Sequence, residues 1–303
     1  MSAERPVWML SVENDKFFAG TDRHYTQGLR LTYYSPRPAN AAFERRLGEF
    51  LSTFRLPLAH AKIARSIGQD LFTPADTDDP ALIPNDRPYA AWLYYSVGYH
   101  AITKETPEAP AQSFVVEASV GAVGPSAQGE FAQNRWHDLI DVPRAQGWRN
   151  QLRDEPGVML TIERRLRLPV NRHMDILPRS GLVLGNVRTH ASVGGAVRLG
   201  WELPKDFGAD LIRPAASDVD TSRKGFSFYG FIAADTRLVL RNIFLDGNTW
   251  KDSHSVRRKR VSWDMNAGVS LNWPQFRVVY TQNYRSKEFY GQLRRDVFGS
   301  ISL

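Results

Sequence analysis

The chain has 303 residues, of which 42% are hydrophobic, 23% charged and 12% aromatic. This composition excludes a disordered chain, because enough apolar side chains are present to offset the entropy lost on folding. No run approaches the roughly 20 apolar residues of a membrane-spanning helix, whereas the alternating strands of an outer-membrane barrel leave an ordinary mean hydropathy. The net charge of +7 suits an anionic partner, such as a nucleic acid, a phosphorylated lipid or a membrane surface.

The chain contains no cysteine, which excludes disulfides, thiolate nucleophiles and cysteine-based metal sites. The first residues lack an apolar core of signal-peptide length. Either the chain is not exported or it begins after the cleavage site, and for an outer-membrane protein we expect the second. No repeat or linker divides the sequence, so we expect one domain over residues 1–303.

Period-two alternation of apolar and polar residues is the dominant pattern along the chain, and it predicts an all-β fold. Turn signals divide the pattern into twelve strands, an even number that is typical of outer-membrane barrels. We predict these strands near residues 6–14, 27–35, 62–71, 88–100, 113–122, 157–167, 174–186, 190–202, 226–240, 259–272, 275–284 and 293–303.

Two segments interrupt the strands with helical spacing. In the segment near 41–56, Phe43, Leu47, Leu51 and Phe54 share one helical face, which predicts a surface cap or a helix at the membrane interface. The segment near 133–152 is also predicted to be helical and carries polar residues of interest. We therefore expect short helices inserted in the loops of an antiparallel barrel.

The predicted strand at 259–272 bears on the choice between a membrane barrel and a soluble β-sandwich. Alternation alone fits both architectures. One face of this strand carries apolar residues between two tryptophans that suit interfacial girdles, Trp263 and Trp273. Ten strand residues tilted by about 40° span roughly 25 Å, the height of a lipid-facing band. The strand therefore favours a barrel, with Val269 pointing outward and Asp264, Asn266 and Asn272 pointing inward.

Polar residues gather at two predicted strand ends near the N-terminus. Glu13, Asn14 and Asp15 lie at the end of the first strand, and the segment 21–28 leads into the second. Carboxylates and amides grouped near a glycine suit a calcium site, although the spacing is not that of an EF-hand. A solvated hairpin loop rich in turn-forming residues has the same composition. The pattern alone leaves both interpretations open.

Two further polar clusters follow. Asp86 and Arg87 are best explained as a structural ion pair that anchors a loop. Gln133 precedes His137 by four residues, so both share one helical face. The Gln133 amide oxygen would then accept from one imidazole nitrogen and leave the other as a base. A purely structural histidine is the alternative.

Several motifs in one order resemble the lipid A deacylase (LpxR) family of outer-membrane proteins. The motifs are ENDKFFAGTDRHYTQGLRLTY, IGQDLFTP, DRPYAAWLYYSVGY, VGAVGP and QNRWH followed by GW and QL. The resemblance covers residues 7–160 in detail and the later strands as alternation. It implies a twelve-stranded barrel and a carboxylic ester hydrolase that removes the 3′-linked acyloxyacyl group of lipid A with the help of Ca²⁺.

The resemblance also implies site residues. Its motifs place catalytic positions at Asn14, Asp15, Thr26, Gln133 and His137, with Asp15 as a metal ligand and the backbone of Gly28 at an oxyanion. It makes His137 the base that deprotonates water. Cations of the outer loops are candidates for contact with the phosphates of lipid A, namely Arg23, Arg135, Arg144 and Arg149.

Two positions depart from the family pattern. A family acidic residue falls on Pro143, with Asp141 as a possible substitute, and a family lysine falls near Asp79. These departures motivate an alternative in which the barrel has lost catalysis and binds lipopolysaccharide or is structural. A soluble sandwich that binds nucleic acid is disfavoured, because no RNA-binding or zinc-finger motif is present. We expect lipid A and the outer membrane as partners and no nucleic acid.

Overall fold

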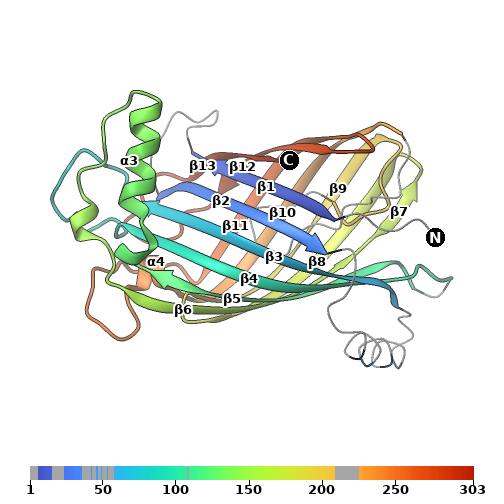
Figure 1. Ribbon diagram of the computed structural model, residues 1–303, viewed down its shortest axis with the longest axis horizontal. Coiled ribbons are helices and arrows are strands. Elements are labelled where there is room, and N and C mark those ends of the chain that lie inside the picture. The colour runs from blue at the N-terminus through green and yellow to red at the C-terminus, as the bar shows by residue number, and fades with distance from the viewer. Residues whose placement is uncertain are drawn as a thin grey trace.

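A computed structural model describes residues 6–15, 24–35, 58–107, 109–208 and 225–303, together with Ala42, Arg46, Glu49 and Thr53. The strands run along the chain in meander order (Figure 1). Their bounds are β1 Val7–Asn14, β2 His24–Ser35, β3 Leu58–Thr73, β4 Ala90–Thr103, β5 Gln112–Val123, β6 Glu155–Leu166, β7 Leu168–Asn171, β8 Met174–Gly185, β9 Arg188–Trp201, β10 Ser227–Asn242, β11 Val261–Asn272, β12 Arg277–Arg285 and β13 Asp296–Ser302.

The strands form a closed antiparallel barrel. Each long strand pairs with the next long strand in sequence, and β1 pairs with β13 to close the circle. The short strand β7 pairs only with β8, and β6 bypasses it to pair with β8 directly. Twelve strands therefore make the wall and β7 is an addition, so the twelve predicted strands are confirmed and β7 was not predicted.

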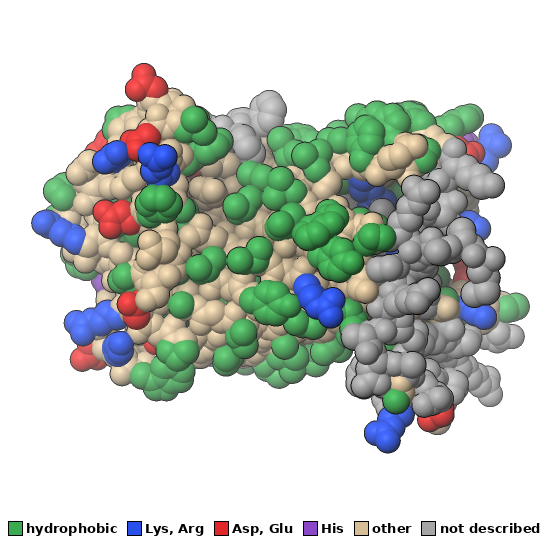
Figure 2. Space-filling view, viewed as in Figure 1, with side chains coloured by type: hydrophobic (Ala, Val, Ile, Leu, Met, Phe, Trp, Pro, Cys, Tyr) green, Lys and Arg blue, Asp and Glu red, His purple; other side chains and the backbone are tan. Residues whose placement is uncertain are grey.

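Side chains alternate across the wall as predicted. On β11 the outward Met265 and Val269 are 50% and 51% exposed, whereas the inward Asn266 and Asn272 are buried. Figure 2 shows hydrophobic side chains over the middle of the barrel, with most charged side chains toward its ends. This band has the character of a lipid-facing surface. The sandwich alternative is wrong, because the Trp263 face is not covered by a second sheet.

The helices labelled α3 and α4 lie at one end of the barrel, which we call the α3 end (Figure 1). The helix α3 spans Gly129–Leu139, with short 3₁₀ turns at Pro125–Ala127 and Trp148–Asn150, and α4 spans Ile243–Asp246. The predicted helix at 133–152 is thus wrong in its bounds, since α3 starts earlier and ends before Asp141, whose φ is 55°. Of the predicted helix at 41–56, only Ala42, Arg46, Glu49 and Thr53 are described, and they are helical. None of the helices in the described part is long and apolar enough to cross a membrane.

Side chains fill the barrel lumen. At the α3 end an aromatic cluster includes Tyr25, Phe72, Trp92, Phe244 and Phe298. Toward the middle, the lumen carries ion pairs instead. Polar residues that point inward can be buried because arginine and carboxylate side chains satisfy each other.

Candidate active site on the outer wall of the barrel

The predicted residues of β1 and β2 lie together at the α3 end. Asn14 is the last residue of β1 and pairs with Gln27, and the Asp15 amide donates to the Thr26 carbonyl at 3.5 Å. Asn14, Asp15 and Thr26 are 5%, 2% and 3% exposed. The fold therefore buries three of the predicted polar residues at one point of the wall.

A β-bulge determines which way Thr26 points. Tyr25 pairs with Phe72 and Gln27 pairs with Leu71, so Thr26 is an extra residue in β2. Tyr25 points into the lumen, where its hydroxyl donates to the Glu13 carboxylate. In a bulge two consecutive residues oppose one partner, and Thr26 and Gln27 both lie on the outer face. There the Thr26 and Thr73 hydroxyls bond at 2.7 Å, with either as donor.

The segment around α3 covers this outer face. Leu71 and Ala91 belong to outward positions of β3 and β4, yet neither is exposed, because they pack with Tyr89, Ala127 and Trp148. A Cβ at Gly129, the first residue of α3, would lie 2.5 Å from the Ala91 Cβ. The strand ladder joins Asn14, Gln27, Leu71 and Ala91 in one row, so α3 lies on the outside of the wall at the level of Asn14.

His137 lies in the last turn of α3 and is 2% exposed. Its Nδ1 is 2.5 Å from the Pro143 carbonyl oxygen. A carbonyl can only accept, so Nδ1 carries a proton and the basic nitrogen of the neutral ring is Nε2. His137 and Asp15 lie at the same end of the barrel, and the tautomer is the one that general-base chemistry at Nε2 needs.

The hydrogen bond predicted between the His137 ring and Gln133 stays a prediction, and the structure shows another partner for each residue. The Gln133 side-chain oxygen accepts from the indole nitrogen of Trp148 at 2.7 Å, in a buried position. Pro143, which departs from the family pattern, orients His137 through its backbone carbonyl. Because this hydrogen-bond acceptor is a backbone atom, it does not depend on which side chain stands at position 143. Asp141 is exposed and is not the described partner of His137.

The predicted phosphate-binding arginines differ in their surroundings. Arg144 makes two hydrogen bonds to the Asp138 carboxylate at 2.7 and 2.8 Å, and this hydrogen bonding lowers the pKa of Asp138. Arg149 donates to the Pro80 carbonyl. Arg135 is exposed on α3, and Arg23 lies outside the described residues. Arg135 is thus the predicted cation with the fewest competing contacts among the described residues.

Gly28 has a packing reason to be glycine. It lies within the ladder between β1 and β3, and a Cβ there would collide with the Tyr25 hydroxyl on the lumen side. Its oxyanion role stays a prediction. Asp79 is exposed, and its carboxylate accepts from the Ala81 amide in a tight turn.

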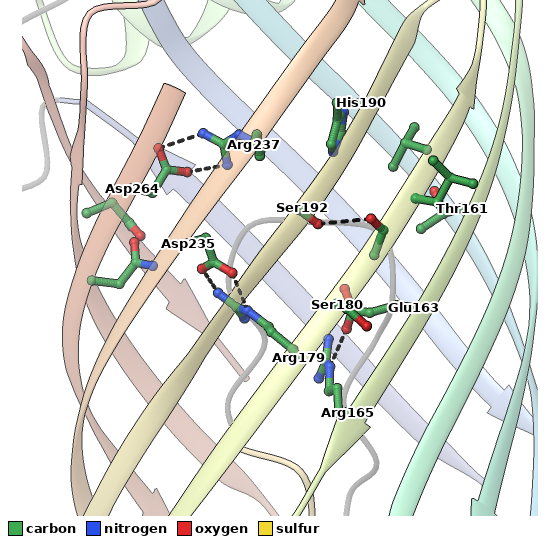
Figure 3. Close-up of a pocket in the computed structure, with 15 residues that line it drawn as sticks. Thr161, Glu163, Arg165, Arg179, Ser180, His190, Ser192, Asp235, Arg237 and Asp264 are labelled. Carbon is green, nitrogen blue, oxygen red and sulfur yellow. Dashed lines mark hydrogen bonds and ion pairs between the residues drawn. The ribbon is translucent and has the colours of Figure 1, made fainter. Parts of the chain in front are cut away.

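The lumen holds a cavity on the far side of the barrel from this site. Its volume is about 60 Å³, and it is lined from β6 and β8 to β12 (Figure 3). Arg179 pairs with Asp235 there, and Arg237 pairs with Asp264 at 2.6 Å. This volume suits about two water molecules. An acyl chain does not fit in this cavity.

The donor set near Asp15 suits a hard cation. Asp15 provides a carboxylate, Asn14 an amide oxygen, and the adjoining backbone has carbonyls, which are the ligand types of Ca²⁺. Within the described part of the chain, no cluster of three His, Asp or Glu side chains forms a metal site alone. A cation bound here would therefore need neutral oxygen ligands, such as amide and backbone carbonyl oxygens, in addition to the Asp15 carboxylate.

Sequence reasoning missed three groups of the site. Trp148 holds Gln133, Thr73 bonds Thr26, and the Pro143 carbonyl orients His137. The GW motif contained Trp148 without indicating its partner. Thr73 and Pro143 gave no signal, because a strand contact and a backbone carbonyl leave no residue pattern.

A closed twelve-stranded barrel with an apolar outer band and a buried polar site on its outer wall defines an outer-membrane protein. The family model of outer membrane protein LpxR matches residues 2–303, and the chain belongs to this family. Among solved structures, LpxR from Salmonella typhimurium aligns with a TM-score of 0.76, covering 99% of each chain at 18% sequence identity, which shows a shared fold. No curated protein matches the sequence significantly.

Proposed function

We propose that this protein is a lipid A 3′-O-deacylase that needs Ca²⁺ and hydrolyses the ester linking the 3′-acyloxyacyl chain of lipopolysaccharide. The observation that carries the proposal is the buried polar site on the outer wall, with His137 held in the tautomer that leaves Nε2 basic. An amphiphile in the outer leaflet would reach such a site without leaving the membrane.

In the proposed reaction, His137 Nε2 takes a proton from water as the water oxygen attacks the ester carbonyl. A tetrahedral intermediate forms and then expels the sugar oxygen at position 3′, which receives the proton from the His137 imidazolium. The products are a free acyloxyacyl acid and lipid A with a 3′-hydroxyl group. The Pro143 carbonyl stabilises the imidazolium between the two proton transfers, because it accepts a hydrogen bond from Nδ1–H throughout.

The other residues bind and orient. Asp15 and Asn14 would hold Ca²⁺, which when bound supplies positive charge for the carbonyl oxygen as it becomes negative. Trp148 fixes the Gln133 amide, so its NH₂ group keeps one direction. Arg135, exposed on α3, is the best placed of the three predicted arginines that the structure describes to meet a phosphate.

The test compares two histidines that make the same kind of structural bond. His137→Ala should lower turnover on purified lipid A by about 10² or more, the usual cost of losing a general base. His173 also bonds a backbone carbonyl through Nδ1, that of Gly200 at 3.1 Å, but lies in the β7–β8 turn at the opposite end. His173→Ala should keep full activity.

Activity is measured per folded barrel, with heat-modifiable gel mobility counting folded molecules and mass spectrometry identifying the released acid. A chelator should abolish activity and added Ca²⁺ should restore it. Near-normal specific activity in His137→Ala would overturn the catalytic role. Wild-type protein that binds lipid A without releasing acid, with or without Ca²⁺, would establish the binding-only alternative.

A further inference from the structure

His24 is a buried residue that the proposed reaction does not use. It is the first residue of β2, 3% exposed, and its φ of 64° places it in the left-handed region. Residues other than glycine seldom adopt this conformation, although histidine does so more often than most. A side chain that holds such a backbone in place therefore needs strong partners.

Both nitrogens of the His24 ring face carboxylates. Nδ1 lies 2.6 Å from the Asp296 carboxylate, and Nε2 lies 3.4 Å from the Asp86 carboxylate. The Gln292 amide donates to the second oxygen of Asp296 at 3.0 Å and orients it. Because a carboxylate accepts, the geometry suits an imidazolium that donates from both nitrogens.

The residues around this ring join three loops at the α3 end. Arg87 donates to the His24 carbonyl at 3.0 Å and pairs with Glu288 at 3.3 Å, while His254 Nε2 lies 2.7 Å from the Asp86 carbonyl. Burial raises the pKa of the Asp86 carboxyl, but the hydrogen bond and charge of His24, together with the backbone amides of Ala75 and Arg87, outweigh it and leave the pKa below its usual value. The Asp86 carboxyl is therefore ionised, as a bond to imidazolium requires.

This cluster lies directly beside the bulge of the site. Thr26 follows His24 by two residues, and its carbonyl accepts from the Asp15 amide at 3.5 Å. Thr73, which bonds the Thr26 hydroxyl, is the strand partner of His24. Any rotation of the backbone at His24 would therefore turn Thr26 and move Asp15.

We propose that His24 is a positioning residue for the reaction. Its ring, held between Asp86 and Asp296, fixes the start of β2 so that the bulge presents Thr26 on the outer face and the Thr26 carbonyl holds the Asp15 amide. The proposal rests on the proposed function. His24 has no contact with the ester in this scheme and acts through Thr26 and Asp15.

The test uses two histidines of the same loop cluster. Asparagine tolerates the left-handed region, so His24→Asn keeps the backbone allowed but is too short to bridge both carboxylates. The matched control is His254→Asn, which removes a bond to Asp86 without touching β2. Asp296→Asn is a milder second variant, since it keeps the shape of the His24 partner and removes its charge.

His24→Asn should lower kcat per folded barrel by about tenfold or more with little change in KM, because misplaced groups slow the chemical step. Asp296→Asn should lower kcat in the same direction, and the double variant should resemble His24→Asn alone. His254→Asn should leave kcat unchanged. Equal kcat in His24→Asn and wild type, or equal losses in His24→Asn and His254→Asn, would overturn the proposal.

Amide hydrogen exchange of the segment 24–28 gives a readout that does not need activity. Exchange there should quicken in His24→Asn and stay normal in His254→Asn. If wild-type protein is inactive on lipid A while exchange behaves as expected, the proposed function fails and the positioning of the bulge stands. Unchanged exchange in an active protein would refute the positioning role alone.

Discussion

A single arginine moved along the outer face of β11 tests whether the barrel spans a membrane. Val261 and Val269 lie on the same strand, both point outward, and they are 54% and 51% exposed. The midpoint between Trp263 and Trp273 is next to Val269. At ~3.3 Å per residue and a tilt of about 40°, Val261 lies roughly 18 Å in depth from this midpoint.

The half-height of a lipid-facing band is about 12 Å, so Val269 lies inside it and Val261 outside. Val269→Arg should lower the free energy of unfolding by ~2–4 kcal/mol, and Val261→Arg by ~0–1 kcal/mol. The two variants share residue type, strand and exposure. A difference between them therefore measures depth in the bilayer and nothing local.

The assay is reversible unfolding in denaturant, from lipid vesicles, followed by tryptophan fluorescence and by heat-modifiable gel mobility. The shift in the midpoint, at unchanged slope, gives the change in free energy. Equal losses in the two variants would refute the placement of the band between the two tryptophans. A larger loss in Val261→Arg would mean that the band lies closer to the α3 end.

Two other substitutions probe the α3 end. A Cβ at Gly129 would lie 2.5 Å from both Ala91 and Trp148. Gly129→Ala should therefore shift α3, lower turnover per folded barrel and lower the free energy of unfolding by ~1–3 kcal/mol. Gly225→Ala, with open space around the added Cβ, should change neither turnover nor stability. Burial raises the pKa of Glu288, but Arg285 and Arg87 outweigh this and lower it to about 2. Ionised Glu288 therefore stabilises the fold above its unfolded pKa of roughly 4.5, and this contribution is lost as pH falls toward 2. Acid titration of folded mobility should show a smaller loss over that window in Glu288→Gln than in wild type.

The strands were predictable because alternation is a local property of the sequence. Each long strand faces lipid on one side and a polar lumen on the other, so every segment carries its own signal. The exception is β7, Leu168–Asn171, where all four side chains are exposed and Pro169 weakens the pattern. The end of α3 carried a signal in Pro143, whereas Gly129 hid its start, since glycine usually weakens a helix.

The contacts of the site were less predictable than its residues. The spacing of Gln133 and His137 correctly put both on one buried face of α3. It could not show that Trp148 competes for the Gln133 oxygen, because Trp148 reaches it through tertiary packing. The cluster around His24 likewise joins residues separated by up to 272 positions. The ion pair suggested for Asp86 and Arg87 divides among other partners, His24 and Glu288.

The position of the site follows from one extra residue in β2. Strict alternation from Leu29 places Tyr25 on the outer face and Thr26 in the lumen, where the aromatic cluster leaves no access to lipid. The bulge reverses this assignment beyond Gln27, so Tyr25 bonds Glu13 inside while Thr26 meets Thr73 outside. The described cavity of about 60 Å³ in the lumen is too small for an acyl chain, so a membrane lipid would meet the protein at its outer wall. The bulge is the local change that puts polar groups there, and the covering segment around α3 then brings His137 to the same end of the wall.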